Sequence, residues 1–329
     1  MIPRHRSWAR FLACVGIALL AAGCGGGGSQ QAQPPANPDT TRTGAPASAP
    51  PDTAVHAGAY RVTAIADQQA LRRLYRSLGS ERFLLALKVN RRDSLHVRNG
   101  DSLMVPDSNA TLLVLSPFPR QVPSTSDFDK LILVSRRVQA FAAYEHGRLT
   151  RWGPTSTGRE SLQTPAGLYH TNWKDAERTS TFNEEWLLKW YLNLDSFLGI
   201  SFHQYELPGY PASHSCIRLM EDDAIWLYGW ADQWTLDPED HRKIVKPGTP
   251  VVVFGQFAFG KKAPWRKLAA DSSATNVPLS EVEGALDGYL RSGRPTPIDS
   301  VRVATLRAIR QAREARARAA DSTRTLPVP

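Results

Sequence analysis

Apolar and polar positions follow different periods along the chain, and the first clear pattern begins at Tyr60. The stretch YRVTAI, residues 60–65, predicts a short strand, and the following QQALRRLYRSLG predicts an amphipathic helix that ends at Gly79. The apolar face of this helix comprises Leu71, Leu74, Tyr75 and Leu78. Together with the apolar runs FLLALKVN and DSLMVPD, these elements predict a small accessory α/β domain at residues 59–115.

A second region, residues 128–258, is dominated by strand patterns. KLILVSRRVQAFAAYEHGRLTRW predicts two strands joined by a turn at residues 145–147, and IVKPGTPVVVFGQF predicts a turn followed by a buried strand. MEDDAIWLYGWAD predicts a helix with acidic residues in its first turn. The apolar face of that helix comprises Ala224, Leu227, Tyr228 and Ala231. EEWLLKWYLNL, residues 184–194, fits either a helix or an aromatic-rich insertion.

Residues 279–322 predict a helical C-terminal tail rich in arginine and alanine. Its apolar edge comprises Val303, Leu306, Ile309 and Ala312. This pattern favours a solvated helix packed on the domain over a binding surface for acidic polymer or lipid. The complete pattern therefore predicts a mainly β fold with a few helices, in which a β-rich domain carries a small N-terminal α/β module and a C-terminal helix.

The N-terminus has the pattern of an export signal. In residues 1–24 a basic start precedes an apolar run that is too short to span a bilayer. Residues 25–58 consist largely of Gly, Gln, Pro, Ala, Ser and Thr and predict a flexible linker. The alternative, a buried N-terminal helix, is disfavoured because GCGGGGSQQAQPP follows directly. Leu20-Ala21-Ala22-Gly23-Cys24 resembles a bacterial lipoprotein processing site, although Ala21 stands where leucine is usual. The resemblance implies lipidation of Cys24 and a periplasmic protein anchored to the outer membrane.

Composition narrows the chemistry. The net charge of the 329 residues is +9, but the excess is concentrated near both ends. No basic helix with interleaved aromatic residues and no zinc-finger or RNA-binding signature is present, so we expect no nucleic-acid partner. Of the 3 cysteines, Cys14 would leave with the signal and Cys24 would carry lipid, which leaves Cys216 alone in the mature domain. A single thiol in an oxidising compartment is either buried and inert or kept for chemistry.

Cys216 lies in the stretch SFHQYELPGYPASHSCIRL, residues 201–219. A thiol attacks as the thiolate and needs a neighbouring imidazole or cation to supply that form at neutral pH. His214 and Arg218, each two positions from Cys216, would share its face in an extended strand, and the Pro- and Gly-rich loop could bring His203 over the sulfur. Two alternatives are a buried cysteine of purely structural role and a zinc site, which lacks a fourth ligand in this stretch.

The same residues are similar to a known signature. His203, followed by Ser213-His214-Ser215-Cys216-Ile217-Arg218, resembles the motif of the L,D-transpeptidases, the YkuD-type catalytic domain. Ser156-Thr157-Gly158 and the stretch TPAGLY at residues 164–169 resemble further segments of that family. Residues 60–106 follow the order strand, helix and apolar run, which is faintly similar to a LysM-type glycan-binding module. The alternative is an accessory domain that does not bind glycan.

The YkuD resemblance implies cysteine-dependent acyl transfer on peptidoglycan stem peptides, without a cofactor or metal. Such a reaction would cross-link the cell wall or attach a protein to it, and would thereby contribute to cell shape. It implies Cys216 as nucleophile, His203 as general base and the Gln204 carbonyl as the group that orients the ring. Supporting or substrate-binding roles fall to Ser213, His214, Ser215 and Arg218. With water as acceptor the same site would make an L,D-carboxypeptidase or cross-link hydrolase. A cell-wall protein could also serve as the acceptor.

Two departures from the family pattern motivate a further alternative, a catalytically decayed cell-wall-binding lipoprotein. Ser215 replaces the glycine that usually precedes the cysteine, which places in question any backbone geometry with positive φ at that position. The interval from His203 to Cys216 is also shorter than usual, and Gln204 follows the histidine where glycine or serine is common. Both the nucleophile and the base are nevertheless present.

Overall fold

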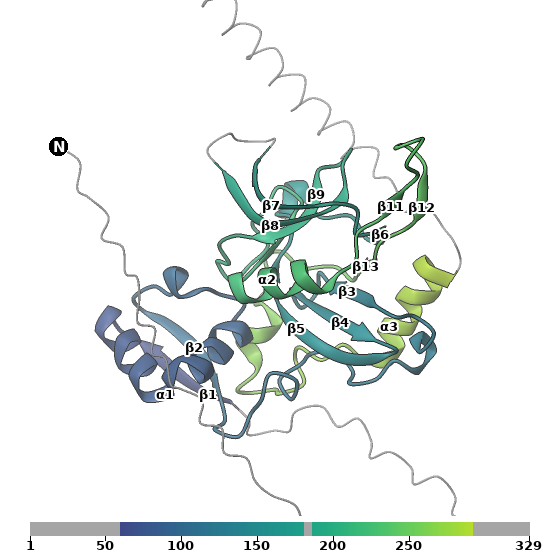
Figure 1. The fold of residues 1–329 in the computed structure, drawn as a ribbon. Coiled ribbons are helices and arrows are strands. Elements are labelled where there is room, and N and C mark those ends of the chain that lie inside the picture. The colour runs from purple at the N-terminus through teal and green to yellow at the C-terminus, as the bar shows by residue number, and fades with distance from the viewer. Residues whose placement is uncertain (1–59, 181–185, 292–329) are drawn as a thin grey trace, which may run out of the picture. The chain divides into compact units, whose positions relative to one another are not determined.

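The computed structural model describes residues 60–180 and 186–291, all within one compact unit of the chain (Figure 1). The predicted signal and linker, Cys24 included, and the tail residues from 292 onward lie outside the described residues. Within the described part of the chain, no helix is both long and apolar enough to cross a membrane.

The N-terminal module consists of two antiparallel strands and a helix that is longer than the periodicity predicts. Strand β1 (Tyr60–Ile65) pairs with β2 (Asp101–Pro106), and α1 (Gln68–Val89) connects them. The Asp67 side chain caps α1 by accepting a hydrogen bond from the Ala70 amide at 2.6 Å. Gly79, with φ 74°, ends only the first helical segment, because the chain resumes the helix and continues to Val89.

One face of α1 matches the prediction except at one position. Leu71, Leu74 and Leu78 are buried, whereas Tyr75 is 47% exposed and packs edge-on against Phe83. Tyr75 precedes the kink at Gly79, and the apolar face of the second segment is set by different residues. The single periodic face read from the sequence therefore does not extend through the whole helix.

A nine-stranded sheet forms the rest of the fold, in the spatial order β6-β13-β3-β4-β5-β10-β9-β8-β7. Its strands are β3 (Leu131–Ser135), β4 (Ala140–Glu145), β5 (Arg148–Ser156), β6 (Gly167–His170), β7 (Lys174–Thr179), β8 (Leu187–Asp195), β9 (Ile200–Gln204), β10 (Ile217–Leu219) and β13 (Pro250–Phe254). A separate hairpin pairs β11 (Thr235–Leu236) with β12 (Ile244–Lys246). The mainly β architecture with few helices is confirmed.

Helices are few and mostly short in the described residues. The α-helices after the module are α2 (Glu221–Trp230) and α3 (Leu279–Ala285). The short 3-10 helices are η1 (Ser94–His96), η2 (Pro123–Thr125), η3 (Glu160–Leu162) and η4 (Pro264–Lys267), and the π-helical turn η5 (Leu286–Arg291) follows α3. The start of the predicted C-terminal helix is thus present, and its apolar edge from Val303 lies outside the described residues.

Two strand predictions need correction. The stretch from residue 130 to 152 contains parts of three strands rather than two, because a further turn at residues 136–139 separates β3 from β4. The sequence does not indicate that turn, because the apolar residue Val138 lies within it and is fully buried. Gln139 ends the turn with φ 48°. Residues 187–194 belong to strand β8 and are not a helix or an insertion. A bulge with Trp190 at φ 54° shifts the register of β8 and breaks the alternation by which a strand is recognised.

The core is built on both faces of the sheet. One cluster gathers around Leu133, Trp152 and Trp265, and the other around Phe141 and Ile217. Helix α2 packs against β8 and β9 through Ala224, Leu227 and Ala231, which are buried in the second cluster (Figure 1). Their burial confirms most of the predicted apolar face of α2.

The N-terminal module shares its core and its charges with the sheet region. Leu207 and Met220, which flank the strand of the cysteine motif, are buried in the cluster formed by β1, α1 and β2. Lys88 at the end of α1 is buried and pairs with Asp222 at 2.8 Å and with Asp223 at the start of α2. Burial raises the pKa of Asp223, and the neighbouring Lys88 opposes that shift. The module is therefore joined to the element that directly follows the motif.

Candidate active site

The pairing of β9 with β10 brings three predicted site residues, His203, Cys216 and Arg218, to one face of the sheet. These two strands are parallel, and Arg218 lies opposite His203 in their register. Because side chains alternate along a strand, Ser201 and Cys216, each two residues before His203 and Arg218 respectively, face the same side of the sheet as that pair. The order of the motif along the chain thus becomes a compact group in space.

This group borders a cavity of about 30 Å³. Its lining consists of Ser180, Trp186, Leu188, His203, Tyr205, Ser213, His214, Cys216 and Arg218. Five of these were predicted from the motif. The other four, Ser180, Trp186, Leu188 and Tyr205, were missed as site residues. The density of aromatic residues in EEWLLKWYLNL was a signal for Trp186.

His203 is held in one orientation and in its neutral form. The ring is 3% exposed, and Nδ1 lies 2.9 Å from the backbone oxygen of Gln204. A carbonyl can only accept, so Nδ1 carries the proton and Nε2 keeps its lone pair. Burial lowers the pKa of His203 to about 4, with a smaller contribution from the Arg218 cation, while the Gln204 hydrogen bond acts in the opposite direction. At neutral pH this imidazole is a proton acceptor.

Cys216 is partly exposed and takes part in no disulfide. The thiol lies 3.2 Å from the backbone oxygen of Gly199, to which it donates, and the Ser201 hydroxyl donates to the sulfur at 3.3 Å. The hydrogen bond from Ser201 stabilises a charged sulfur, whereas the hydrogen bond to Gly199 stabilises the thiol. Ser201 was not singled out by the sequence, because a serine two residues before a histidine carries no distinctive signal.

Ser215 resolves the question raised by its replacement of glycine. Its φ of 106° lies in the region that favours glycine, and the residue adopts this conformation while fully buried. Hydrogen bonds hold it on three sides: its amide donates to Ser213 Oγ at 3.0 Å, its hydroxyl to the Leu162 oxygen at 3.1 Å, and Thr164 Oγ1 donates to its carbonyl at 2.8 Å. The turn before Cys216 thus retains its positive φ without a glycine.

The segments predicted from the STG and TPAGLY stretches support that turn. Gly158 forms a bridge with Ser213, and the Gly158 amide donates to Thr164 Oγ1 at 3.0 Å. Ser213 Oγ also donates to the carbonyl of Cys216 at 2.5 Å. Ser213 therefore lines the cavity and fixes the backbone on both sides of the sulfur.

Arg218 and His214 give the cavity a cationic and aromatic wall. The Arg218 guanidinium stacks over the Tyr205 ring at 4.5 Å and donates to the Glu206 oxygen at 3.4 Å. The ring of His214 lies 5.2 Å from that of Trp186. Burial lowers the pKa of His214, and the cations Arg159 and Arg218 lower it further. A site with this balance of charge suits an anionic group on a ligand.

A metal centre has no support in the part of the chain that the structure describes. Among these residues, no group of three or more His, Cys, Asp or Glu side chains lies close enough to hold a metal ion. The histidines of the motif instead use their surroundings for hydrogen bonding and stacking.

With the site in place, comparison with protein families gives a direct match. Residues 129–253 match the YkuD family, the L,D-transpeptidase catalytic domain. The match confirms the resemblance predicted from the motif, and its bounds lie within the predicted 128–258. We call residues 129–253 the YkuD region. No curated protein matches the sequence.

Solved structures with a similar fold include several L,D-transpeptidases. The enzyme from Stackebrandtia nassauensis is 21% identical, with 39% of this chain and 57% of that chain covered and a TM-score of 0.32. The enzyme from Mycobacterium smegmatis is 19% identical, with 39% and 59% covered and a TM-score of 0.31. L,D-transpeptidase 3 from Mycobacterium tuberculosis, in complex with a faropenem-derived adduct, is 20% identical, with 39% and 60% covered and a TM-score of 0.31. The chain thus spans less than two thirds of each of these structures.

Proposed function

We propose that this protein transfers acyl groups of peptidoglycan stem peptides through a thioester on Cys216, as an L,D-transpeptidase. The observation that carries the proposal is the state of His203: its Nδ1 is fixed by the Gln204 carbonyl, and the ring borders the same cavity as the sulfur. A neutral imidazole with one nitrogen anchored is the arrangement a cysteine nucleophile needs for general-base activation.

In the first half-reaction the thiol proton moves to Nε2 of His203, and the sulfur attacks the carbonyl on the L side of the stem peptide. The bond to the terminal D-alanine breaks, the imidazolium returns its proton to the departing amine, and Cys216 holds the acyl group as a thioester. In the second half-reaction an amine of another stem attacks, gives its proton to His203, and releases the thiol. No cofactor enters either step.

Arg218 is proposed to bind a carboxylate of the donor peptide. Its guanidinium can bind a carboxylate bidentately, and both its stacking on Tyr205 and its hydrogen bond to Glu206 limit its orientation. Trp186 and His214 supply an aromatic wall against which peptide atoms can pack. The Ser215 amide already donates to Ser213 Oγ, which makes it a weak candidate for an oxyanion donor.

The cellular location is also part of the proposal. We propose that the protein is exported to the periplasm and anchored to the outer membrane through lipid on Cys24, with residues 25–58 as a tether. Metabolic labelling with a palmitate analogue tests this, because Cys24→Ala should abolish the label.

Mass spectrometry of muropeptides tests the reaction. Purified protein incubated with sacculi that contain tetrapeptide stems should produce L,D-linked dimers, and Cys216→Ala should produce none. Released tripeptides without dimers would instead assign water as the acceptor, and thus a carboxypeptidase. The proposal would be contradicted if neither protein produced shortened stems or dimers. Retained binding to sacculi in that case would favour the decayed, cell-wall-binding alternative.

A further inference from the structure

The segment that follows β9 forms one wall of the cavity. Tyr205 lines the cavity, its amide donates to the Leu219 oxygen at 3.2 Å, and its ring stacks on the guanidinium of Arg218. The next residue, Glu206, offers its backbone oxygen to Arg218. The position of Arg218 therefore depends on where residues 205–207 lie.

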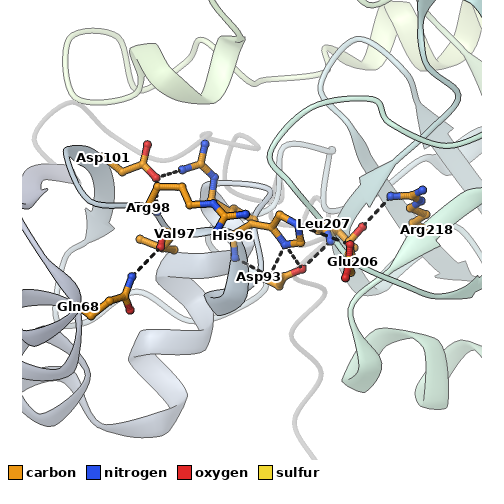
Figure 2. A network of polar contacts seen from close by, with 10 residues as sticks. Gln68, Asp93, His96, Val97, Arg98, Asp101, Glu206, Leu207 and Arg218 are labelled. Atoms are coloured by element: carbon orange, nitrogen blue, oxygen red, sulfur yellow. Dashed lines mark hydrogen bonds and ion pairs between the residues drawn. The ribbon is translucent and has the colours of Figure 1, made fainter.

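That segment is held by the N-terminal module and not only by the sheet. The Asp93 amide donates to the Leu207 oxygen at 2.9 Å, and the Leu207 amide donates to Asp93 Oδ2 at 2.7 Å. Arg92 forms a bridge with Pro208, and the Leu207 side chain is fully buried in the core of the module. Figure 2 shows Asp93 between the module and Leu207.

His96 extends the same connection to Glu206. Its Nδ1 lies 2.8 Å from Asp93 Oδ1, and its Nε2 lies 3.6 Å from Glu206 Oε2. Figure 2 shows the resulting series of contacts, which runs from Asp93 through His96 and Glu206 to Arg218. The Asp93 side chain thus contacts both Leu207 and His96.

We propose that Asp93 is a positioning residue for the catalytic site: through Leu207 and His96 it holds residues 205–207, and these hold Arg218 where it receives the carboxylate of the substrate. The N-terminal module is then a part of the catalytic site rather than only an attached binding module. The carboxylate role of Arg218 rests on the proposed function, whereas the placement of a cation beside Cys216 does not.

The physical reason is the number of donors that share one carboxylate. Without it, the Leu207 amide and the His96 ring each lose an acceptor in a part-buried site. Residues 205–207 then exchange among several positions, and Arg218 spends only a fraction of its time beside the sulfur. Affinity for a ligand that needs the ordered state falls by that fraction.

The test compares Asp93→Ala with a matched control in the same module. Asp67→Ala removes another aspartate that caps a helix with a hydrogen bond to a backbone amide, but Asp67 lies at the start of α1 and has no contact with residues 205–207. Each variant loses one cap, worth about a threefold to thirtyfold decrease in the folding equilibrium constant, and Asp93→Ala also loses the contacts with the Leu207 amide and the His96 ring. Loss of the cap alone would make the two variants behave alike.

The first measurement is alkylation of Cys216 by iodoacetate and by its neutral analogue iodoacetamide, followed by intact mass. In the wild-type protein, Arg218 should favour iodoacetate by about fivefold relative to the ratio for a small free thiol. Asp93→Ala should lower this preference by at least about threefold and leave the iodoacetamide rate within about twofold, since the sulfur and His203 are unaffected. Asp67→Ala should keep the wild-type ratio, and Asp93→Asn, which retains an acceptor oxygen, should restore part of it.

The second measurement separates this inference from the proposed function. With a tetrapeptide-stem donor, Asp93→Ala should raise KM by roughly 5- to 100-fold with kcat nearly unchanged. If Asp93→Ala changes the ratio of the iodoacetate rate to the iodoacetamide rate but the wild-type protein shows no turnover, the inference about Asp93 holds and the transpeptidase proposal is rejected. An unchanged ratio in Asp93→Ala, or an equal loss in Asp67→Ala, would overturn the inference even if turnover is normal.

Discussion

The strained turn before the nucleophile allows a prediction whose sign is opposite to the usual one. Ser215 has φ 106°, and its hydroxyl donates to the Leu162 oxygen. Ser215→Ala and Ser215→Gly both remove the hydroxyl, so the difference between them reports only on the backbone. In ordinary loops alanine is the more stable of the two, by about 0.4–1 kcal/mol, because glycine has more conformational freedom in the unfolded chain.

The geometry at Ser215 reverses that order. A residue with a Cβ costs on the order of 1–3 kcal/mol in a sparsely populated region of φ, and glycine avoids this cost. After subtraction of the unfolded-state term, Ser215→Gly should be about 1 kcal/mol more stable than Ser215→Ala. Relative to wild type, Ser215→Ala should be destabilised by about 1–3 kcal/mol, since the buried Leu162 carbonyl loses its donor.

Urea denaturation followed by tryptophan fluorescence measures both variants, provided that their m-values agree. Ser215→Ala equal to or more stable than Ser215→Gly would refute the assigned backbone conformation. The same pair also tests function, because a turn that keeps its φ should keep the rate of Cys216 alkylation in both variants.

Two further predictions concern His203 and Leu207. The pKa of His203 is about 4 in the folded state and near 6.5 in the unfolded state, so the unfolded chain binds more protons between these values. The free energy of unfolding should therefore rise by on the order of 3 kcal/mol from pH 4 to pH 6.5. If His203→Gln shows the same dependence of unfolding free energy on pH as the wild-type protein, the assignment is contradicted. Activity should likewise persist below pH 6 and decline only near pH 4, as a pH–rate profile would show. Leu207→Ala should cost about 2–5 kcal/mol of unfolding free energy and also raise KM, whereas Leu74→Ala, in the same cluster but remote from residues 205–207, should affect stability alone.

The elements with clear periodicity were predictable from sequence. Strand β1, the first segment of α1 and helix α2 have regular apolar spacing and recognisable boundaries, and all three are present. The failures arise where tertiary structure overrides local pattern. Val138 is an apolar residue inside a turn, and the Trp190 bulge interrupts the alternation of β8. Neither feature is visible without the neighbouring strands.

The site followed a similar division. The grouping of His203, Cys216 and Arg218 was accessible because it depends on spacing along two strands and on a recognisable motif. The roles of Tyr205 and Asp93 could not be predicted, because they depend on tertiary contacts. Tyr205 stacks on Arg218, and Asp93 contacts Leu207, which lies more than a hundred residues further along the chain. A lone aspartate before a short helix has no signature that distinguishes it from an ordinary cap.

The central claim is that His203 activates Cys216 within an accessible cavity, and covalent capture tests it most directly. Intact mass spectrometry over time with imipenem should show one adduct on the wild-type protein, none on Cys216→Ala, and formation slowed by at least about 100-fold in His203→Ala. Equal rates in the wild-type protein and His203→Ala, or an adduct that persists in Cys216→Ala, would contradict the account.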